Sequence, residues 1–216
     1  VPETIGSIGY ISKNLKYLKN NIIAGYILTC LGDERCISYL PSRKGNTLSD
    51  RFALEVLKKI KYKKRYYTWL DRASDERQYC SPGVDLPICS IMKSKYGSYK
   101  EYHTSLDGVG NVVTKKGLQQ SFRIYKSIIE LIENSYFPKS KKICEPFMTK
   151  YNLYPTINNR SNWIIPSELR VRNIMNFISW CDGTHSIEEI SKKIKLNIFS
   201  VKKIYNLLLR KKLLNL

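Results

Sequence analysis

Few side chains in this sequence could bind a metal ion or transfer a proton, and three of them stand beside predicted turns. His103 lies among carboxylates in the run 101–107, and such a histidine can bind zinc through one ring nitrogen while an acid holds the other. Asp33 follows an apolar run, and open α/β sheets bind ligands beyond the carboxyl ends of their strands. Glu3 precedes a helix start. Plainer roles also fit these types: a loop histidine, a turn aspartate, and an acid favoured by a helix N-terminus.

A second group of charged side chains lies between two predicted strands. The run from Arg72 to Gln78 contains Asp75, Glu76 and Arg77 and precedes the turn Ser81-Pro82-Gly83. Such a loop is either solvated or contacts a substrate at the sheet edge, because scaffold loops often carry binding residues. Both alternatives stay open from the spacing alone.

The elements that would position these residues alternate between helix and strand over residues 1–137. Helical periodicity is found at residues 7–18, 47–60 and 117–134, and Thr47 with Asp50 indicates a cap for the second helix. Apolar runs at residues 22–31, 66–70 and 86–92 indicate strands. The run 22–31 is uninterrupted, as expected of a central strand in a parallel sheet. We therefore expect an α/β fold with a mostly parallel, helix-flanked sheet.

The rest of the chain has a different pattern. Residues 138–159 hold three prolines and begin a polar run, which predicts a linker. Residues 160–216 predict a small winged-helix domain: a helix over 167–181, a second opened by the Ser186 and Glu189 capping box, and a third over 201–212. The last four residues could begin a wing strand.

Composition narrows the possible partners and location. The net charge of +19 permits non-specific nucleic-acid binding, although the 26 lysines are spread along the chain and also fit a solvated surface. No apolar run has the roughly 18–20 residues of a membrane helix, and no leader is visible. The six cysteines form no CxxC pair. We expect reduced thiols and a cytoplasmic location, without membrane association. The sequence leaves open whether the chain forms a homo-oligomer.

The order of several motifs carries a resemblance to a known family. The order of Glu3 with Gly6-Ser7, a strand ending at Asp33, the run from Ser74 and the run from Tyr102 to Asp107 resembles the second half of a two-zinc aminopeptidase catalytic domain. The closer likeness is in the stretches Pro2–Ser7, Ser42–Thr47, Ser74–Cys80 and Glu101–Asp107. They look most like a bacterial subgroup of aminopeptidase-like proteins from polysaccharide biosynthesis clusters. That subgroup carries a peptidase-like domain followed by a winged helix, and the resemblance covers nearly the whole chain.

This resemblance implies roles for individual residues. Glu3 would match the general base, Asp33 and His103 zinc ligands, and Tyr102 the donor to the tetrahedral oxyanion. The loop with Asp75, Glu76 and Arg77 would lie at the substrate. Zinc would be the cofactor, and a peptide or small amide the substrate. The chemistry would be hydrolysis of an amide, with a link to surface polysaccharide biosynthesis.

Two features depart from the family pattern. Thr4 stands where relatives carry a second glutamate, and the family's first zinc histidine and bridging aspartate come from a segment before Glu3. We therefore expect the 1–137 domain to be incomplete at its N-terminus and to lack a complete active site as given. The alternatives are a non-catalytic scaffold and a winged-helix DNA-binding regulator. We also expect large apolar groups of the last domain, including Trp163, Ile164, Ile165, Phe177, Trp180 and Phe199, to pack in part across the domain boundary.

Overall fold

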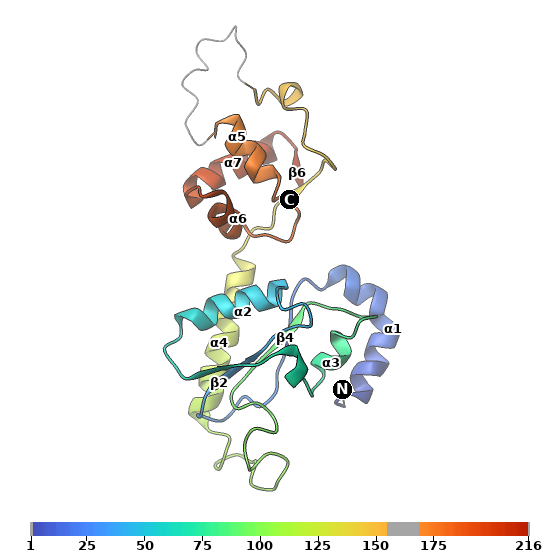
Figure 1. Cartoon of the computed structure of the whole chain (residues 1–216), viewed down its shortest axis with the longest axis vertical. Coiled ribbons are helices and arrows are strands. Elements are labelled where there is room, and N and C mark those ends of the chain that lie inside the picture. The colour runs from blue at the N-terminus through green and yellow to red at the C-terminus, as the bar shows by residue number, and fades with distance from the viewer. Residues whose placement is uncertain (1, 155–168, 216) are drawn as a thin grey trace. The chain divides into compact units, whose positions relative to one another are not determined.

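The computed structural model describes residues 2–154 and 169–215 and divides the chain into two compact units (Figure 1). The first unit is Val1–Glu133 and the second is Asn134–Leu216. The first has α/β architecture and the second is mainly helical. The predicted fold class, an α/β part followed by a winged helix, is confirmed.

A four-stranded sheet forms the centre of the first unit. Its strands are β1 (Gly25–Ile27), β2 (Ile37–Leu40), β3 (Lys64–Tyr66) and β4 (Ile88–Met92), in the order β1-β4-β2-β3. β1 pairs with β4 and β2 with β3 in parallel, whereas β2 and β4 are antiparallel. The sheet is thus mostly parallel, as predicted. The run 22–31 differs from expectation, because only three of its residues form a strand, and that strand lies at the outer position among the described residues.

Helices cover both faces of this sheet. They are α1 (Ile5–Asn21), α2 (Leu48–Lys59), α3 (Glu76–Tyr79) and α4 (Lys115–Glu133), with a short 3-10 helix at Trp69–Asp71 in place of the end of the strand predicted at 66–70. α2 and α4 pack together on one face, while α1 and α3 pack on the other (Figure 1). The predicted capping box of Thr47 and Asp50 is present. Asp50 is fully buried, and hydrogen bonds from Ser42 and Tyr39 offset the cost of burying its carboxylate.

The second unit is a winged helix with a two-stranded sheet. It contains β5 (Lys139–Ser140), a 3-10 helix (Met148–Tyr151), α5 (Val171–Ile178), α6 (Ile187–Ile194), α7 (Ile198–Arg210) and β6 (Leu214–Asn215). The capping box of Ser186 and Glu189 opens α6, as predicted, and β6 pairs antiparallel with β5. β5 lies inside the predicted linker 138–159. A two-residue strand is too short for periodicity to reveal, and the prolines around it suggest a break.

The core of this unit explains part of its apolar content. Phe177 is fully buried with Ile174, Ile190 and Ile204, and Trp180 packs against the same cluster. These two aromatic groups therefore find partners inside their own unit, whereas Phe199 is exposed on α7. Trp163, Ile164 and Ile165 lie outside the described residues, as does the start of the helix predicted from residue 167.

Helix α4 is the longest of the helices described, yet charged residues interrupt its apolar positions. No helix in the described parts of the chain combines the length and apolar character needed to cross a membrane.

A close backbone approach fixes α4 against the segment that follows β1. A Cβ atom added at Gly117 would lie 1.9 Å from the carbonyl oxygen of Gly32 and 2.8 Å from that of Asp33. Ser121 Oγ also donates to the carbonyl oxygen of Leu31 at 2.7 Å. Glycine is unfavourable inside a helix, so its presence at position 117 needs a reason. That reason is packing, since any larger side chain would clash with the backbone of Gly32.

We predict that Gly117→Ala lowers the free energy of unfolding by about 2 kcal/mol or more, because the methyl group has no space beside Gly32. Gly9→Ala is the matched control. Gly9 also lies in a helix but has no atom near its added Cβ, so alanine should raise stability by up to about 1 kcal/mol. Urea unfolding followed by circular dichroism measures both changes. Equal stabilisation by the two substitutions would contradict the close packing.

Candidate functional site

Four of the residues singled out by sequence line one cavity of the first unit. The cavity has a volume of about 360 Å³, within the usual range for small-molecule sites. It lies where the chain leaves β1, and its wall includes polar side chains from three separate segments: Glu3, Asp33, Tyr99, Tyr102, His103 and Asp107. The structure thus brings Glu3, Asp33, Tyr102 and His103 together. Their chemical roles stay predictions.

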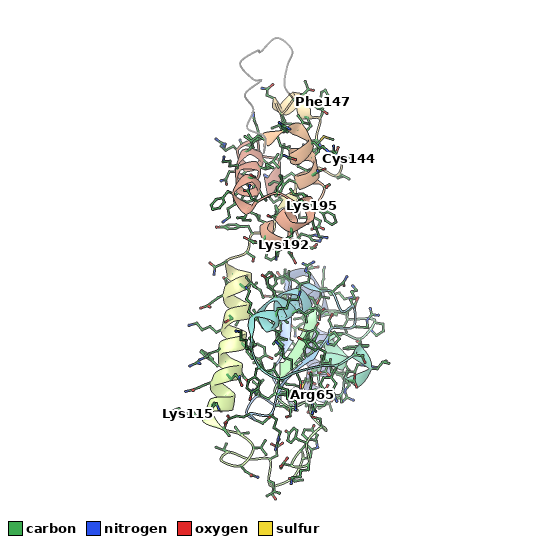
Figure 2. All side chains as sticks on the ribbon, turned by 60° about the vertical axis from the view of Figure 1, so that its left-hand side comes forward. Arg65, Lys115, Cys144, Phe147, Lys192 and Lys195 are labelled. Carbon is green, nitrogen blue, oxygen red and sulfur yellow. The ribbon has the colours of Figure 1, made fainter. Side chains whose placement is uncertain are left out.

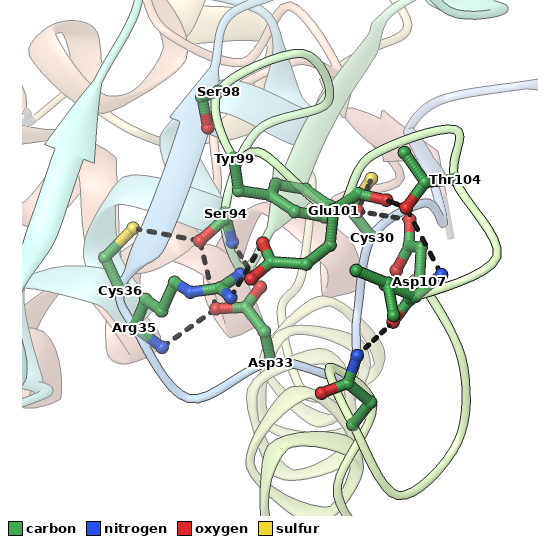
Figure 3. A network of polar contacts seen from close by, with 12 residues as sticks. Cys30, Asp33, Arg35, Cys36, Ser94, Ser98, Tyr99, Glu101, Thr104 and Asp107 are labelled. Atoms are coloured by element: carbon green, nitrogen blue, oxygen red, sulfur yellow. Dashed lines mark hydrogen bonds and ion pairs between the residues drawn. The ribbon is translucent and has the colours of Figure 1, made fainter.

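Asp33 is buried and joins the segment after β1 to the segment after β4 (Figure 3). Its Oδ2 accepts from the backbone N–H of Ser94 at 2.7 Å, and its Oδ1 accepts from Ser94 Oγ at 3.0 Å. Oδ1 also accepts from the backbone N–H of Arg35 at 2.8 Å. Both carboxylate oxygens are therefore already engaged in holding the protein together, and a metal ion would have to compete with these donors.

Glu3 is held in place by the charged loop that follows residue 72. Ser74 Oγ donates to Glu3 Oε1 at 2.7 Å, and Asp75 Oδ1 accepts from the backbone N–H of Thr4 at 2.7 Å. Arg77 donates to Thr4 Oγ1 at 2.9 Å. Thr4 has a φ of 63°, which is strained for a β-branched residue and is maintained by these contacts. The loop therefore fixes the orientation of Glu3, which lies just before α1.

Glu76 has a supporting position in the same loop. It is fully buried, and its Oε1 accepts from the N–H groups of Ala73 and Ser74, both at 2.9 Å, and from the hydroxyl of Tyr96 at 2.6 Å. The resemblance places Asp75, Glu76 and Arg77 at the substrate. In the structure none of the three lines the cavity. Asp75 and Arg77 contact Thr4, and Glu76 holds the loop itself.

Tyr102 and His103 form an aromatic pair in the cavity wall. Their rings stack with centroids 4.0 Å apart, and His103 has a φ of 57°, in the left-handed region. Burial, with a contribution from the nearby Cys30 and Glu3, raises the pKa of Tyr102. The hydroxyl therefore keeps its proton at neutral pH and is available as a hydrogen-bond donor.

Three further residues of the wall were not assigned by sequence. Tyr99 donates to Asp107 Oδ2 at 2.8 Å, and its hydroxyl lies 3.8 Å from Cys30 Sγ. Burial raises the pKa of the Cys30 thiol, so at neutral pH it is protonated and not a thiolate nucleophile. Asp107 stands in the same run as His103, and this proximity was the available signal. Cys30 lies within the apolar run 22–31 and gave none.

The donor set does not make a complete zinc site. Within residues 2–154 and 169–215, no three His, Cys, Asp or Glu side chains are grouped as metal ligands. Asp33 is engaged with Ser94 and Arg35, which leaves His103 as the plainest donor of the predicted pair. The two-zinc centre implied by the resemblance is thus not built by the described residues of this chain, and zinc stays a prediction.

The family of the first unit follows from its match to a family model. Residues 1–135 match the model described as a domain of unknown function, DUF4910. The chain belongs to this family. Residues 137–216 match a winged helix-turn-helix model, in agreement with the second unit of the structure.

Two relatives give this DUF4910 chain a wider context. It is 34% identical over 220 residues to a Clostridium acetobutylicum protein described as a polysaccharide biosynthesis protein with an aminopeptidase-like domain. A crystal structure of a candidate peptidase from that organism matches it with a TM-score of 0.63 and 30% identity. Each match covers 100% of this chain but 48% and 46% of the relative, so the chain spans about half the length of these relatives. The predicted resemblance to an aminopeptidase-like protein with a winged helix is confirmed.

We predict that Asp33→Ala lowers the free energy of unfolding of the metal-free protein by about 3 kcal/mol, because it leaves buried N–H donors without an acceptor. Asp33→Asn keeps one acceptor oxygen and should cost less. Urea unfolding in the presence of a chelator measures these values. The control is Asp71→Ala, which removes an exposed cap and should cost about 1 kcal/mol. An Asp33→Ala protein as stable as the wild type would instead favour a role in metal binding alone.

Proposed function

We propose that this chain contributes one wall of an amide-hydrolysing site of the aminopeptidase type. The observation that carries the proposal is the shared cavity, since Glu3, Tyr102 and His103 reach it from segments about a hundred residues apart in the sequence. Polar residues without a shared role would be expected to scatter over the surface, whereas these three line one cavity. The C. acetobutylicum matches, described in one comparison by an aminopeptidase-like domain and in the other as a candidate peptidase, support the same chemistry.

Glu3 and Tyr102 would have complementary roles in this site. The Glu3 carboxylate, fixed by Ser74, would take a proton from the attacking water and return it to the leaving amine. The protonated hydroxyl of Tyr102 would donate to the oxyanion of the tetrahedral intermediate. Zinc, when bound, would activate the water and polarise the carbonyl, and His103 would be one ligand. The remaining ligands would have to come from outside the described residues, and a peptide or small amide would be the substrate.

The setting of this activity is part of the same proposal. The C. acetobutylicum relative is named as a polysaccharide biosynthesis protein. We therefore propose that the substrate is an amide of a surface-polysaccharide precursor. All six cysteines are free thiols, which supports a reducing, cytoplasmic location.

Zinc titration tests the incomplete site directly. We predict that the 216-residue chain binds zinc weakly by calorimetry and does not cleave leucine p-nitroanilide, because a two-ion centre needs about five or six protein ligands. His103→Ala should abolish the weak binding, whereas His185→Ala, in the winged helix, should leave it unchanged. Tight binding of two ions, or equal effects of the two substitutions, would overturn the assignment. The full-length C. acetobutylicum relative should cleave amides with zinc, and its failure would favour a non-catalytic scaffold.

The winged helix favours a second candidate function, the binding of duplex nucleic acid. Residues 134–216 hold 15 basic and 5 acidic residues, a net charge of +10, whereas the longer remainder carries +9. The exposed face of α7 presents Lys202, Lys203, Asn206 and Arg210, and the helix contains no acid. Lys192 and Lys195 add positive charge at the end of α6 and just after it (Figure 2). Lysines of this kind suit phosphate contacts, and few of the side chains suit base recognition.

We predict non-specific, salt-sensitive binding of duplex DNA. Because each phosphate contact contributes about 0.9 to the slope of log K against log salt, replacing Lys202 and Lys203 by alanine should reduce that slope by about 2. The control removes the same charge from α1 through Lys13→Ala and Lys16→Ala. Fluorescence anisotropy over a salt series measures both. Equal losses for the two double variants would assign the binding to net charge, and selection of a defined sequence from random duplexes would instead indicate a regulator.

A further inference from the structure

The outer strand of the sheet has the sequence of an inner one. β1 lies at the margin of the sheet formed by the described residues, but the run 22–31 that contains it is uninterrupted in its apolar character. Parallel strands with such runs are normally buried on both faces and paired on both edges. Here Ile23 and Leu28, which flank β1, are 60% and 63% exposed. The sequence of β1 thus suits a strand paired on both edges, whereas the described residues pair it on one edge only.

The backbone of β1 has one open edge. The N–H of Gly25 donates to the carbonyl oxygen of Pro87 at 3.0 Å, on the side of β4. Successive residues of a strand direct their N–H and C=O groups to opposite sides, so Tyr26 directs its own groups away from β4. No other strand of the described residues pairs on that side. An open edge of this kind is a template for pairing with another strand.

An apolar stripe on α4 lies beside the same edge. Leu118, Phe122 and Ile129 are 47%, 68% and 55% exposed, and their spacing of four and seven residues places them on one face of the helix. Tyr125 belongs to that face, and its hydroxyl donates to the carbonyl oxygen of Ile27 in β1 at 3.2 Å. In Figure 2, α4 begins at Lys115 and stands at the margin of the first unit. The Tyr125 hydroxyl also contacts the carbonyl oxygen of Ile91 in β4, so the helix lies over β1 and β4. The open edge of β1 and the exposed stripe of α4 are together called the open surface.

The lengths of the relatives indicate what this surface binds. Both comparisons cover the whole chain but only 48% and 46% of the other protein, so family members of that length contain as much polypeptide again. We infer that the open surface of β1 and α4 binds that remaining half, which adds a parallel strand next to β1 and apolar side chains over Leu118, Phe122 and Ile129. A second copy of this chain related by a two-fold axis would pair β1 with β1 antiparallel, which fits the parallel character of the run less well.

This inference goes beyond the proposed function and does not depend on it. Leu118 belongs to the stripe and also lines the cavity, together with Thr29 and Leu31 from the segment after β1. Polypeptide bound over the stripe would therefore also contribute to the cavity wall. The surface could serve this purpose in a catalytic protein or in a scaffold.

A binding experiment with separate halves tests the surface. We mix the 216-residue chain with the half of the C. acetobutylicum relative that it does not match, and the relative's own two halves are the positive control. A one-to-one complex is expected by size exclusion with light scattering. Exchange of the Tyr26 amide hydrogen should slow at least about tenfold in the complex, because the amide gains a partner.

Charged substitutions locate the contact. Phe122→Asp with Ile129→Asp should abolish the complex while leaving the fold intact, because both side chains are exposed. The control is Ile8→Asp with Leu106→Asp, which places the same charges on exposed apolar residues elsewhere in the first unit. The inference is overturned if only the control halves associate, if neither pair does, or if both double variants act equally. It is also overturned if the chain alone forms a dimer that Phe122→Asp and Ile129→Asp disrupt.

Discussion

The carboxylate of Asp33 is the interaction on which the arrangement of the cavity depends. It connects the segment leaving β1 with the segment leaving β4 through Ser94, and it fixes the turn to Arg35. Behind this turn, Gly117 allows α4 to touch the backbone of Gly32. These contacts together fix the part of the cavity wall formed by the segment after β1. Other segments position Glu3, Tyr102 and His103. Asp33 therefore serves the site by position, whatever it does chemically.

Positive charge is buried close to this turn. Lys93 is fully buried next to Ser94, its ammonium contacts Gln120, and it lies 4.6 Å from the centroid of the Tyr62 ring. Burial lowers the pKa of Lys93, while the negative charge of Asp33 opposes that shift. A buried lysine without an adjacent carboxylate partner is costly, and the ring of Tyr62 and the amide of Gln120 reduce that cost. Asp33 thus also stabilises this part of the core electrostatically.

The sequence predicted the fold class because its signals were local. The capping boxes at Thr47 and Ser186 each lie within a few residues and were found correctly. The outer position of β1 and the short β5 could not be found in this way, since both depend on which strands lie beside them. Apolar character reports how a strand is buried, and among the described residues no further strand pairs with β1.

The sequence singled out four residues that line the cavity, but not the contacts that hold them. His103, Asp33 and Glu3 were found from residue types and from the order of motifs, whereas the role of the loop at Asp75 depends on contacts across about seventy residues. Hydrogen bonds with that loop hold Thr4 at a positive φ. Cys30 and His103, which line the cavity, also have positive φ. Such conformations cost roughly 1–3 kcal/mol each and persist where the surroundings enforce them, as they do at functional sites. Thr4 adjoins Glu3 of the cavity wall, so the hydrogen bonds that hold Thr4 and Glu3 to Asp75 and Ser74 also fix the orientation of Glu3.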